Sequence, residues 1–379
     1  MRILFVTPYY KPYLGGVERV IEKLAVEFTY AGHFVGVLTT RYSFPRTYHR
    51  DLVNKEDDGP VEIYRLSSWP HQPLPFYAAP LTWFSPLEVR QIVENFRPDA
   101  IIYMTDKWFG ANFWVRLFSN NSKQIWCPVF HDLTPAKFWL RPINWVFSKM
   151  VSWVGVVSKL EAEKVKKAYG VSLAKIKLIP WGVSKAAVAS PFASSRPEVL
   201  IIAVGRISRH KGQKWLVERF LEVAPTAEVP CRLVLIGEAE EPQELEAIRS
   251  LLSRGGEWGE QVIVDLSAND QKLAEYYSAA DVFALFPEYE SFGLVFLEAM
   301  SYGVPVLTHN VGALKEVFGN NPGAVLVDRY DQAAAASLLH MINDAAYRKE
   351  LGLKGQEFVR QNYSWKKCAS EFLSLMLKI

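Results

Sequence analysis

The sequence contains only three cysteines, Cys127, Cys231 and Cys368, and they lie far apart. There is no CxxC pair, which argues against a disulfide framework or a zinc site and favours a reducing, cytoplasmic compartment. Long apolar runs are also missing. The first run stops at Pro8, so no secretory leader is expected. The longest uncharged stretch, residues 66–87, contains five prolines, which would break a membrane-spanning helix.

The chain has little net charge, +3 from 43 basic and 40 acidic side chains. A protein that binds nucleic acid through its phosphates needs a larger basic excess, so no nucleic-acid partner is expected. The charge is unevenly distributed. Residues 1–185 carry +9 and nine of the twelve tryptophans, whereas residues 186–379 carry −6. The two halves are therefore expected to meet different partners.

Hydrophobic residues make up half of the chain, enough for large buried cores. Short apolar runs alternate with helical patterns, starting with a strand over residues 2–7, a helix over 17–30 and a strand over 34–40. The same pattern predicts further strands at 100–104, 124–130, 153–157, 176–179, 199–204, 232–236, 261–265, 281–286, 304–308 and 324–327. Apolar strands alternating with helices predict parallel sheets covered on both faces.

Residues 184–198 are small, polar and proline-bearing, which indicates a linker. We therefore predict an α/β protein of two doubly wound, Rossmann-like domains, over residues 1–188 and 196–361. Ligands of such sheets bind at the carboxyl ends of the strands. Two domains facing each other would line one central cleft.

Two glutamates, Glu290 and Glu298, stand eight positions apart in the segment PEYESFGLVFLEAMSYGVP, residues 287–305. Ser291 is a natural N-cap for a helix over 292–302. Glu290 would then lie just before the helix, and Glu298 two turns along it on the face that carries the N-terminus. Both carboxylates could reach one ligand.

The start of this helix would present the backbone N–H groups of Phe292, Gly293 and Leu294, which favour an anion such as a diphosphate. A carboxylate farther along could accept hydrogen bonds from a diol such as ribose. The spacing alone is equally typical of an amphipathic helix with two solvated glutamates.

A second segment, VGRISRHK, follows a predicted strand and holds Arg206, Arg209 and Lys211 in one loop. Arginine can bind phosphate oxygens bidentately and lysine binds them as a point charge, so the loop could neutralise a leaving diphosphate without a metal ion. Any one of these cations alone is more typical of a solvated surface. Their shared loop at a strand's carboxyl end is what favours a site.

Two weaker signals lie in the first half. Gly15 and Gly16 precede a helix and would let the backbone approach a ligand, although glycines at a turn more often serve backbone geometry. His131 follows the predicted strand at 124–130 and would face the cleft. A lone histidine is more often structural than catalytic.

Together these segments resemble glycosyltransferase family 4, retaining enzymes of the GT-B fold that use nucleotide sugars. The resemblance rests on Gly15 and Gly16, on Gly205-Arg206 with Lys211, and on Glu290 and Glu298 with the Ser-Phe-Gly after the first. Val157-Ser158 and the segment 179–183 also match. Three positions depart from the family pattern: Trp181 replaces Asn, Lys315 replaces Pro, and Asp265 falls where Gly is common. None of the three is a donor-phosphate residue.

The resemblance implies roles for these residues. Arg206 and Lys211 would hold the donor diphosphate, Glu298 the ribose and Glu290 the sugar hydroxyls, while His131 would touch the sugar. The remaining donor-binding positions implied are Gly15, Gly16, Ser291, Phe292, Gly293 and Leu294. The last helix, within 362–379, would pack back on the first domain.

The implied reaction moves a hexosyl unit from a GDP- or UDP-linked sugar to a hydroxyl of a saccharide or lipid-linked saccharide, as in polysaccharide and cell-envelope biosynthesis. It would proceed with retention and with no metal or other cofactor. A sugar-nucleotide epimerase or hydrolase, or a non-catalytic sugar-nucleotide-binding protein, would keep the same cleft. A Rossmann dehydrogenase is disfavoured because no GxGxxG motif is present.

The acceptor side contains the aromatic and basic segment KFWLRPINWVFSKMVSW, residues 137–153. Its tryptophans and cations could rest on an anionic membrane, which would make the protein peripheral on the cytoplasmic face. A packed core helix explains the same pattern. The relevant residues are Trp139, Trp145 and Trp153 with Lys137, Arg141 and Lys149.

Overall fold

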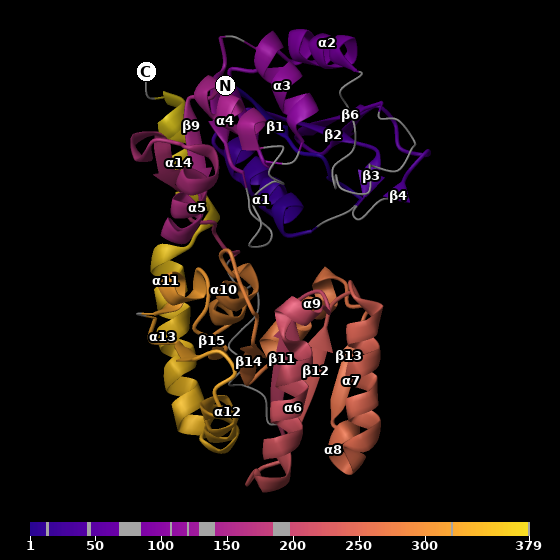
Figure 1. The fold of residues 1–379 in the computed structure, drawn as a ribbon, viewed down its shortest axis with the longest axis vertical. Coiled ribbons are helices and arrows are strands. Elements are labelled where there is room, and N and C mark those ends of the chain that lie inside the picture. Colours follow the sequence, from indigo (N-terminus) through magenta and orange to yellow (C-terminus); the bar gives the residue numbers. More distant parts are fainter. Residues whose placement is uncertain are drawn as a thin grey trace. The chain divides into compact units, whose positions relative to one another are not determined.

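The computed structural model describes residues 1–12, 15–43, 47–67, 85–106, 108–119, 121–128, 141–184, 198–319 and 321–377. The chain divides into two compact units (Figure 1). Unit 1 comprises Met1–Gly182 and Trp365–Ile379, and unit 2 comprises Val183–Ser364. The chain thus enters unit 2 a few residues earlier than the predicted end of the first domain at residue 188.

In the described part of unit 1, one sheet has the strand order β10-β9-β8-β7-β1-β2-β6-β5. Its strands are β1 Arg2–Val6, β2 Phe34–Thr40, β5 Lys55–Asp58, β6 Val61–Leu66, β7 Ala100–Tyr103, β8 Lys123–Trp126, β9 Trp153–Val156 and β10 Ile176–Leu178. A short antiparallel pair, β3 Tyr42–Ser43 and β4 Thr47–Tyr48, lies outside this sheet.

The sheet of unit 1 is parallel except at one edge, where β5 runs antiparallel to β6. These two strands were not among those predicted from the sequence. The sequence of β5, KEDD, is charged throughout because an edge strand needs to bury little of its surface. It is a strand because it pairs with β6, and its own composition gives no strand signal.

The helices in the described part of unit 1 are α1 Gly16–Tyr30, α2 Pro86–Phe96, α3 Phe109–Phe118, α4 Arg141–Met150, α5 Lys159–Tyr169 and α14 Trp365–Leu377. The core lies between them and the sheet, and it includes Leu4, Ile101, Tyr103, Trp126 and Phe147. Strand β1 is buried from Ile3 to Val6, which explains its continuous apolar run.

The last helix, α14, belongs to unit 1 although it follows unit 2 in the sequence. It packs against α1, where the rings of Phe28 and Phe372 meet edge to face at 6.5 Å between centroids. Its inward side chains, Trp365, Cys368, Phe372 and Leu375, are buried. Among the described residues, no helix is both long and apolar enough to span a bilayer.

Unit 2 contains a wholly parallel sheet in its described residues, in the order β13-β12-β11-β14-β15-β16. The strands are β11 Val199–Val204, β12 Cys231–Ile236, β13 Val262–Asp265, β14 Val282–Leu285, β15 Val306–His309 and β16 Ala324–Val327. Every residue of β11, β14 and β15 is buried, as expected for central strands covered on both faces. All six were predicted to within two residues.

The helices of unit 2 are α6 Gln213–Val223, α7 Pro242–Arg254, α8 Gly256–Glu260, α9 Asp270–Ala279, α10 Leu294–Ser301, α11 Leu314–Phe318, α12 Ala333–Asn343 and α13 Ala345–Asn362. The order of its strands reverses direction between β11 and β14. From β11 the chain moves outward through β12 and β13, and from β14 it moves outward on the other side. Ligands of open α/β sheets bind at such a switch point.

Candidate functional site

Three loops of unit 2 leave the carboxyl ends of adjacent strands β11, β14 and β15, at the switch point. The β11 loop begins at Gly205, whose φ of 154° disfavours any other residue. It is anchored by the fully buried Ile207, which bridges to Ala239 after β12. A 3-10 helix, Arg209–Lys211, then leads into α6. The loop carries all three cations predicted from the sequence.

A buried glutamine holds the start of this loop. Gln213 lies at the first position of α6, and its amide nitrogen donates to the carbonyl oxygens of Gly205 at 3.2 Å and Arg206 at 2.9 Å. Ser208 Oγ lies 2.9 Å from His210 Nδ1. The backbone on both sides of Arg206 is thereby tied to the helix that follows.

The β14 loop is fastened to the β11 loop through its backbone. The Glu288 N–H donates to the carbonyl oxygen of His210 at 2.7 Å. Gly212, with φ of 72°, lies so close to β14 that a Cβ there would be 2.0 Å from the carbonyl oxygen of Phe286. The β15 loop joins in through the Ala313 N–H, which donates to the carbonyl oxygen of Glu290 at 2.9 Å.

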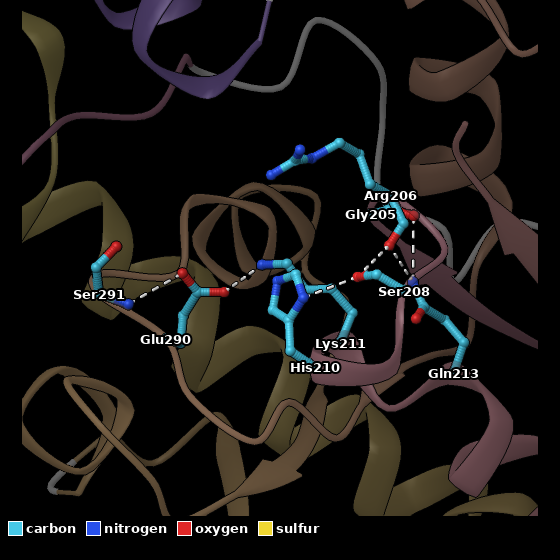
Figure 2. A network of polar contacts seen from close by, with 8 residues as sticks. All are labelled: Gly205, Arg206, Ser208, His210, Lys211, Gln213, Glu290 and Ser291. Atoms are coloured by element: carbon cyan, nitrogen blue, oxygen red, sulfur yellow. Dashed lines mark hydrogen bonds and ion pairs between the residues drawn. The ribbon is translucent and has the colours of Figure 1, made fainter. Parts of the chain in front are cut away.

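An ion pair between Lys211 and Glu290 lies where the β11 and β14 loops meet, and Figure 2 shows the two side chains pointing toward each other. Lys211 Nζ is 2.7 Å from Glu290 Oε2, and the two side chains are 18% and 12% exposed. The other carboxylate oxygen, Oε1, accepts a hydrogen bond from the Ser291 N–H at 3.1 Å. Loops 79 residues apart in the sequence thus share one largely buried charge pair.

The protonation of these groups follows from their neighbours. Burial alone would raise the pKa of Glu290, but the charge and hydrogen bond of Lys211 and the Ser291 N–H outweigh it and hold the pKa below its usual value. Glu290 is therefore ionised at neutral pH. Burial, together with the charge of Lys211, lowers the pKa of His210, so this imidazole is neutral there.

Arg206, at the other end of the β11 loop, forms an ion pair with Glu240. Glu240 follows β12, the neighbouring strand. The side chain of Arg206 is 38% exposed, so this pair is worth less than a buried one. Arg209 differs from Arg206 and Lys211, because its side chain is 82% exposed and its Nε lies 3.9 Å from Glu288 Oε1. It fits the alternative that the sequence allowed, a solvated surface cation.

The helix after Glu290 begins later than predicted. Its N-cap is Gly293, with φ of 90°, and α10 starts at Leu294; Ser291 as N-cap is therefore wrong. A Cβ on Gly293 would lie 2.7 Å from Leu314 Cδ2, so packing as well as backbone conformation requires glycine. The N–H groups of Leu294 and Val295 begin the helix. Those of Phe292 and Gly293 belong to the preceding loop.

Glu298 lies just over one turn into α10, not two turns as predicted. Its Oε2 accepts a hydrogen bond from the Tyr277 hydroxyl of α9 at 3.0 Å. Glu298 as a residue is partly exposed. Asp265, one of the departures from the family pattern, ends β13 and is paired with Lys272 at 2.6 Å and with the Tyr276 hydroxyl at 2.9 Å.

A buried histidine supports the loop that carries Glu290. His309 ends β15, is 1% exposed, and hydrogen-bonds the carbonyl oxygen of Pro287 through Nδ1 at 3.1 Å. Because a carbonyl only accepts, Nδ1 carries the proton, and Nε2 accepts from the Tyr330 N–H at 3.4 Å. Burial lowers the pKa of His309, in keeping with this neutral form.

The site residues predicted in the first half of the chain are not part of these three loops of unit 2. Gly15 is the N-cap of α1 in unit 1, in extended conformation, and Gly16 is the first helical residue. No described atom lies within 4 Å of a Cβ built on Gly16, so neither packing nor a positive φ calls for glycine there. A role in ligand approach stays a prediction. His131 lies outside the described residues.

Four side chains that contact the site residues or their loops were not predicted from the sequence: Glu240, Gln213, Tyr277 and His309. Glu240 had a usable signal, because the acidic run 238–241 follows a predicted strand next to the one that carries Arg206. The other three occupy ordinary helix or strand positions. Only the folded arrangement shows that they contact the site.

Comparison with known families accounts for nearly the whole chain. Residues 14–186 match the model of Glycosyltransferase Family 4, and residues 189–358 match that of Glycosyl transferases group 1. The class that these two models and the two Rossmann-like units define is that of the GT-B glycosyltransferases. The chain belongs to glycosyltransferase family 4.

Three relatives illustrate the range of similarity. A D-inositol 3-phosphate glycosyltransferase from Xylanimonas cellulosilytica is 32% identical over 231 residues, 57% of this chain and 54% of the relative. The chain thus spans about half the length of this enzyme, and 48% of its counterpart from Acidothermus cellulolyticus. An uncharacterized glycosyltransferase, MJ1607, from Methanocaldococcus jannaschii is 24% identical and matches 99% of this chain and 97% of its own.

Solved structures agree on the fold. Sucrose-phosphate synthase from Thermosynechococcus elongatus superposes with a TM-score of 0.77 at 21% identity, over 99% of this chain and 98% of that one. HepE from Anabaena, solved in complex with UDP and glucose, has a TM-score of 0.73 at 18% identity, over 100% and 99%. At these identities the similarity establishes the GT-B fold.

Proposed function

We propose that the protein transfers a hexosyl unit from a GDP- or UDP-linked sugar to a hydroxyl of a saccharide or lipid-linked saccharide, with retention and without a metal ion. The observation that carries the proposal is the cluster of cations at the switch point of unit 2. Arg206 and Lys211 lie on one loop, held by carboxylates of neighbouring loops, beside the loop that leads to the N-terminus of α10.

Glycosyl transfer develops negative charge on the leaving diphosphate while the sugar becomes oxocarbenium-like. Fixed cations and helix N–H groups aimed at that charge stabilise the transition state more than the bound substrate. The loop is anchored on both sides of Arg206, by Ile207 and by Gln213, so little reorganisation is needed. In this proposal the fixed cations and N–H groups neutralise the developing charge that a divalent cation neutralises in other phosphate sites.

Each cation can bind phosphate without giving up its carboxylate. The ammonium of Lys211 has three N–H donors and the guanidinium of Arg206 has five, so one bond to a glutamate leaves others. In this proposal Glu290 and Glu240 orient the two cations, and the diphosphate binds the remaining N–H groups. Gly293 and Leu294 would add backbone N–H groups, and Ser291 and Phe292 would line the approach.

The two glutamates of the motif then have separate tasks. Glu290, ionised beside Lys211, suits hydrogen bonds from the hydroxyls of the donor sugar and is not a proton donor at neutral pH. Glu298, oriented by Tyr277, suits the ribose diol. Neither has to attack the sugar if the leaving phosphate itself deprotonates the acceptor hydroxyl on the same face, which gives retention.

The roles that the family resemblance implies for Gly15, Gly16 and His131, contact with the donor phosphates and with the donor sugar, remain part of this proposal. We further propose that the reaction takes place on the cytoplasmic side. The three cysteines are buried and unpaired, which suits a reducing compartment.

A thermal-shift panel with UDP, GDP and ADP, each with magnesium and with EDTA, tests the donor class. A nucleoside diphosphate at 100 times its Kd should stabilise the fold by about 2.7 kcal/mol, a shift of several degrees in Tm. We expect UDP or GDP to give this shift in EDTA as well as in magnesium. No shift at millimolar concentration with any of the three would contradict the proposal.

The matching sugar nucleotide then gives the reaction. Product analysis with and without a saccharide acceptor should show an α-linked product from an α-linked donor. Release of free sugar alone, or conversion to an epimer, would instead indicate a hydrolase or an epimerase.

A further inference from the structure

Helix α4 exposes an apolar face. The sequence alone allowed two explanations for this segment, packing in the core and contact with a membrane. The helix buries Asn144, Phe147 and Ser148 against unit 1. On the opposite face Trp145 is 50% exposed and Val146 46% exposed. Trp139 lies outside the described residues, and Trp153 is half-buried in strand β9. The core explanation therefore holds for only one side of the helix.

Contacts with neighbouring elements hold the exposed face of α4 in place. The indole of Trp145 lies over Gly170, the C-cap of α5, where a Cβ would be 3.2 Å from Trp145 Cδ1. Lys149 Nζ is 5.6 Å from the centroid of the Trp145 ring. Lys175 Nζ donates to the carbonyl oxygen of Ser148 at 2.6 Å and fastens the end of α4.

A third apolar side chain, Leu173, is 52% exposed in the 3-10 helix Leu173–Lys175, which carries this lysine. We refer to Arg141, Trp145, Val146, Lys149 and Leu173 as the α4 surface. All five are exposed. Lys166 and Lys167, also exposed, lie in the last turn of α5, next to Gly170.

The charge around this surface is almost entirely of one sign. Residues 141–178 contain eight basic side chains and two acidic ones, Glu161 and Glu163. Glu161 is buried, where its carboxylate accepts a hydrogen bond from the Val157 N–H at 2.7 Å and caps α5. A surface with exposed tryptophan and aliphatic side chains among cations is complementary to the interface of an anionic bilayer.

We propose that the α4 surface docks on a lipid bilayer that contains anionic phospholipids. Trp145 would lie at the headgroup level, where its ring is buried and its N–H stays hydrated. Val146 and Leu173 would enter the apolar boundary, and Arg141, Lys149, Lys166 and Lys167 would meet the phosphates. A nucleic acid would use the cations but leave the aliphatic side chains exposed. This inference does not depend on the proposed transfer reaction.

Vesicle flotation tests it with the whole chain. Vesicles of phosphatidylcholine with about a third phosphatidylglycerol should carry the protein at low salt, and vesicles of phosphatidylcholine alone should carry much less. Binding should fall steeply as salt is raised, because exposed charges are screened. Trp145→Ser should weaken binding about tenfold. Lys149→Gln should weaken it about fivefold.

The chain offers a matched pair of control variants in α13 of unit 2. Leu353 is 50% exposed, like Trp145, and Lys349 is exposed in the same helix. Leu353→Ser and Lys349→Gln should leave flotation unchanged. Since Trp145 packs on Gly170, the unfolding temperature of each variant is measured in parallel. Lys149→Gln and Val146→Gln keep the test valid if Trp145→Ser proves unstable.

Three results would overturn the proposal. They are a failure to float with anionic vesicles at low salt, equal binding to neutral and anionic vesicles, and unchanged binding in stable variants of the α4 surface. The nucleotide thermal shift of these variants should equal that of the unmodified chain. The membrane proposal can therefore fail while the donor-site proposal stands, and the donor-site proposal can fail while the membrane proposal stands.

Discussion

Replacing Arg206 and Lys211 together by alanine is expected to lower kcat/KM for sugar transfer by about 10³-fold or more. Loss of a single donor that stabilises developing negative charge typically costs about 10²- to 10³-fold. The two side chains lie on one anchored loop and would act on the same diphosphate. Steady-state kinetics with the sugar nucleotide identified by the thermal-shift panel measures the effect.

The two substitutions differ in their structural cost, and the controls use that difference. Lys211→Ala leaves the buried carboxylate of Glu290 without its cation, which is expected to cost about 3–5 kcal/mol of stability. Arg206→Ala removes a partly exposed pair and should cost less than about 1 kcal/mol. The single variant Arg206→Ala therefore reports on catalysis in a stable protein, with an expected loss of about 10²-fold.

Arg329→Ala is the matched control. Arg329 follows β16 in the same unit, is 44% exposed and is paired with Glu288 at 3.2 Å. It resembles Arg206 in exposure and in having a glutamate partner, but the proposal gives it no contact with the diphosphate. Near-normal turnover in Arg206→Ala with Lys211→Ala, or an equal loss in Arg329→Ala, would refute the assigned role.

Gly212→Ala is expected to destabilise unit 2 by about 3 kcal/mol or more and to weaken nucleotide binding. The backbone at Gly212 has φ of 72°, and an added Cβ would be 2.0 Å from the carbonyl oxygen of Phe286. A left-handed conformation alone costs about 1–3 kcal/mol, and the collision adds to it. Relief of the collision would move the β11 loop away from β14, and with it Lys211 from Glu290.

Gly256→Ala separates the two causes. Gly256 also has a positive φ, 55°, but no atom lies within 4 Å of its added Cβ. This variant should lose about 1 kcal/mol and keep its full nucleotide affinity. Chemical unfolding and nucleotide titration of both variants give the comparison. Equal stability and equal affinity in the two variants would show that the close approach of the two loops is unimportant.

Six of the eight described strands in the sheet of unit 1 and all six described strands of unit 2 could be predicted because their apolar patterns are local. Strand β11, with sequence VLIIAV, is buried along its whole length and carries its own signal. Strand β5, with sequence KEDD, carries none, because it is a strand only through its pairing with β6. The reversal of strand order between β11 and β14 is likewise not readable from a local pattern.

The candidate site residues were predicted from their type and spacing. The side chains with which they pair were not predicted. Lys211 and Glu290 were assigned to one site, but their ion pair depends on the adjacency of β11 and β14. The pairing of Arg206 with Glu240 depends in the same way on β12. The start of α10 was misplaced because Ser291 is a common N-cap, whereas Leu314 and Phe296 crowd Gly293 and fix the turn there.

The central claim is that the diphosphate of the donor binds between the β11 loop and the N-terminus of α10, and a crystal structure with bound UDP or GDP tests it most directly. We expect phosphate oxygens about 3 Å from Lys211 Nζ, from the guanidinium of Arg206 and from the backbone N–H groups at the start of α10. A diphosphate bound elsewhere, with Lys211 contacting only Glu290 and Arg206 only Glu240, would contradict it.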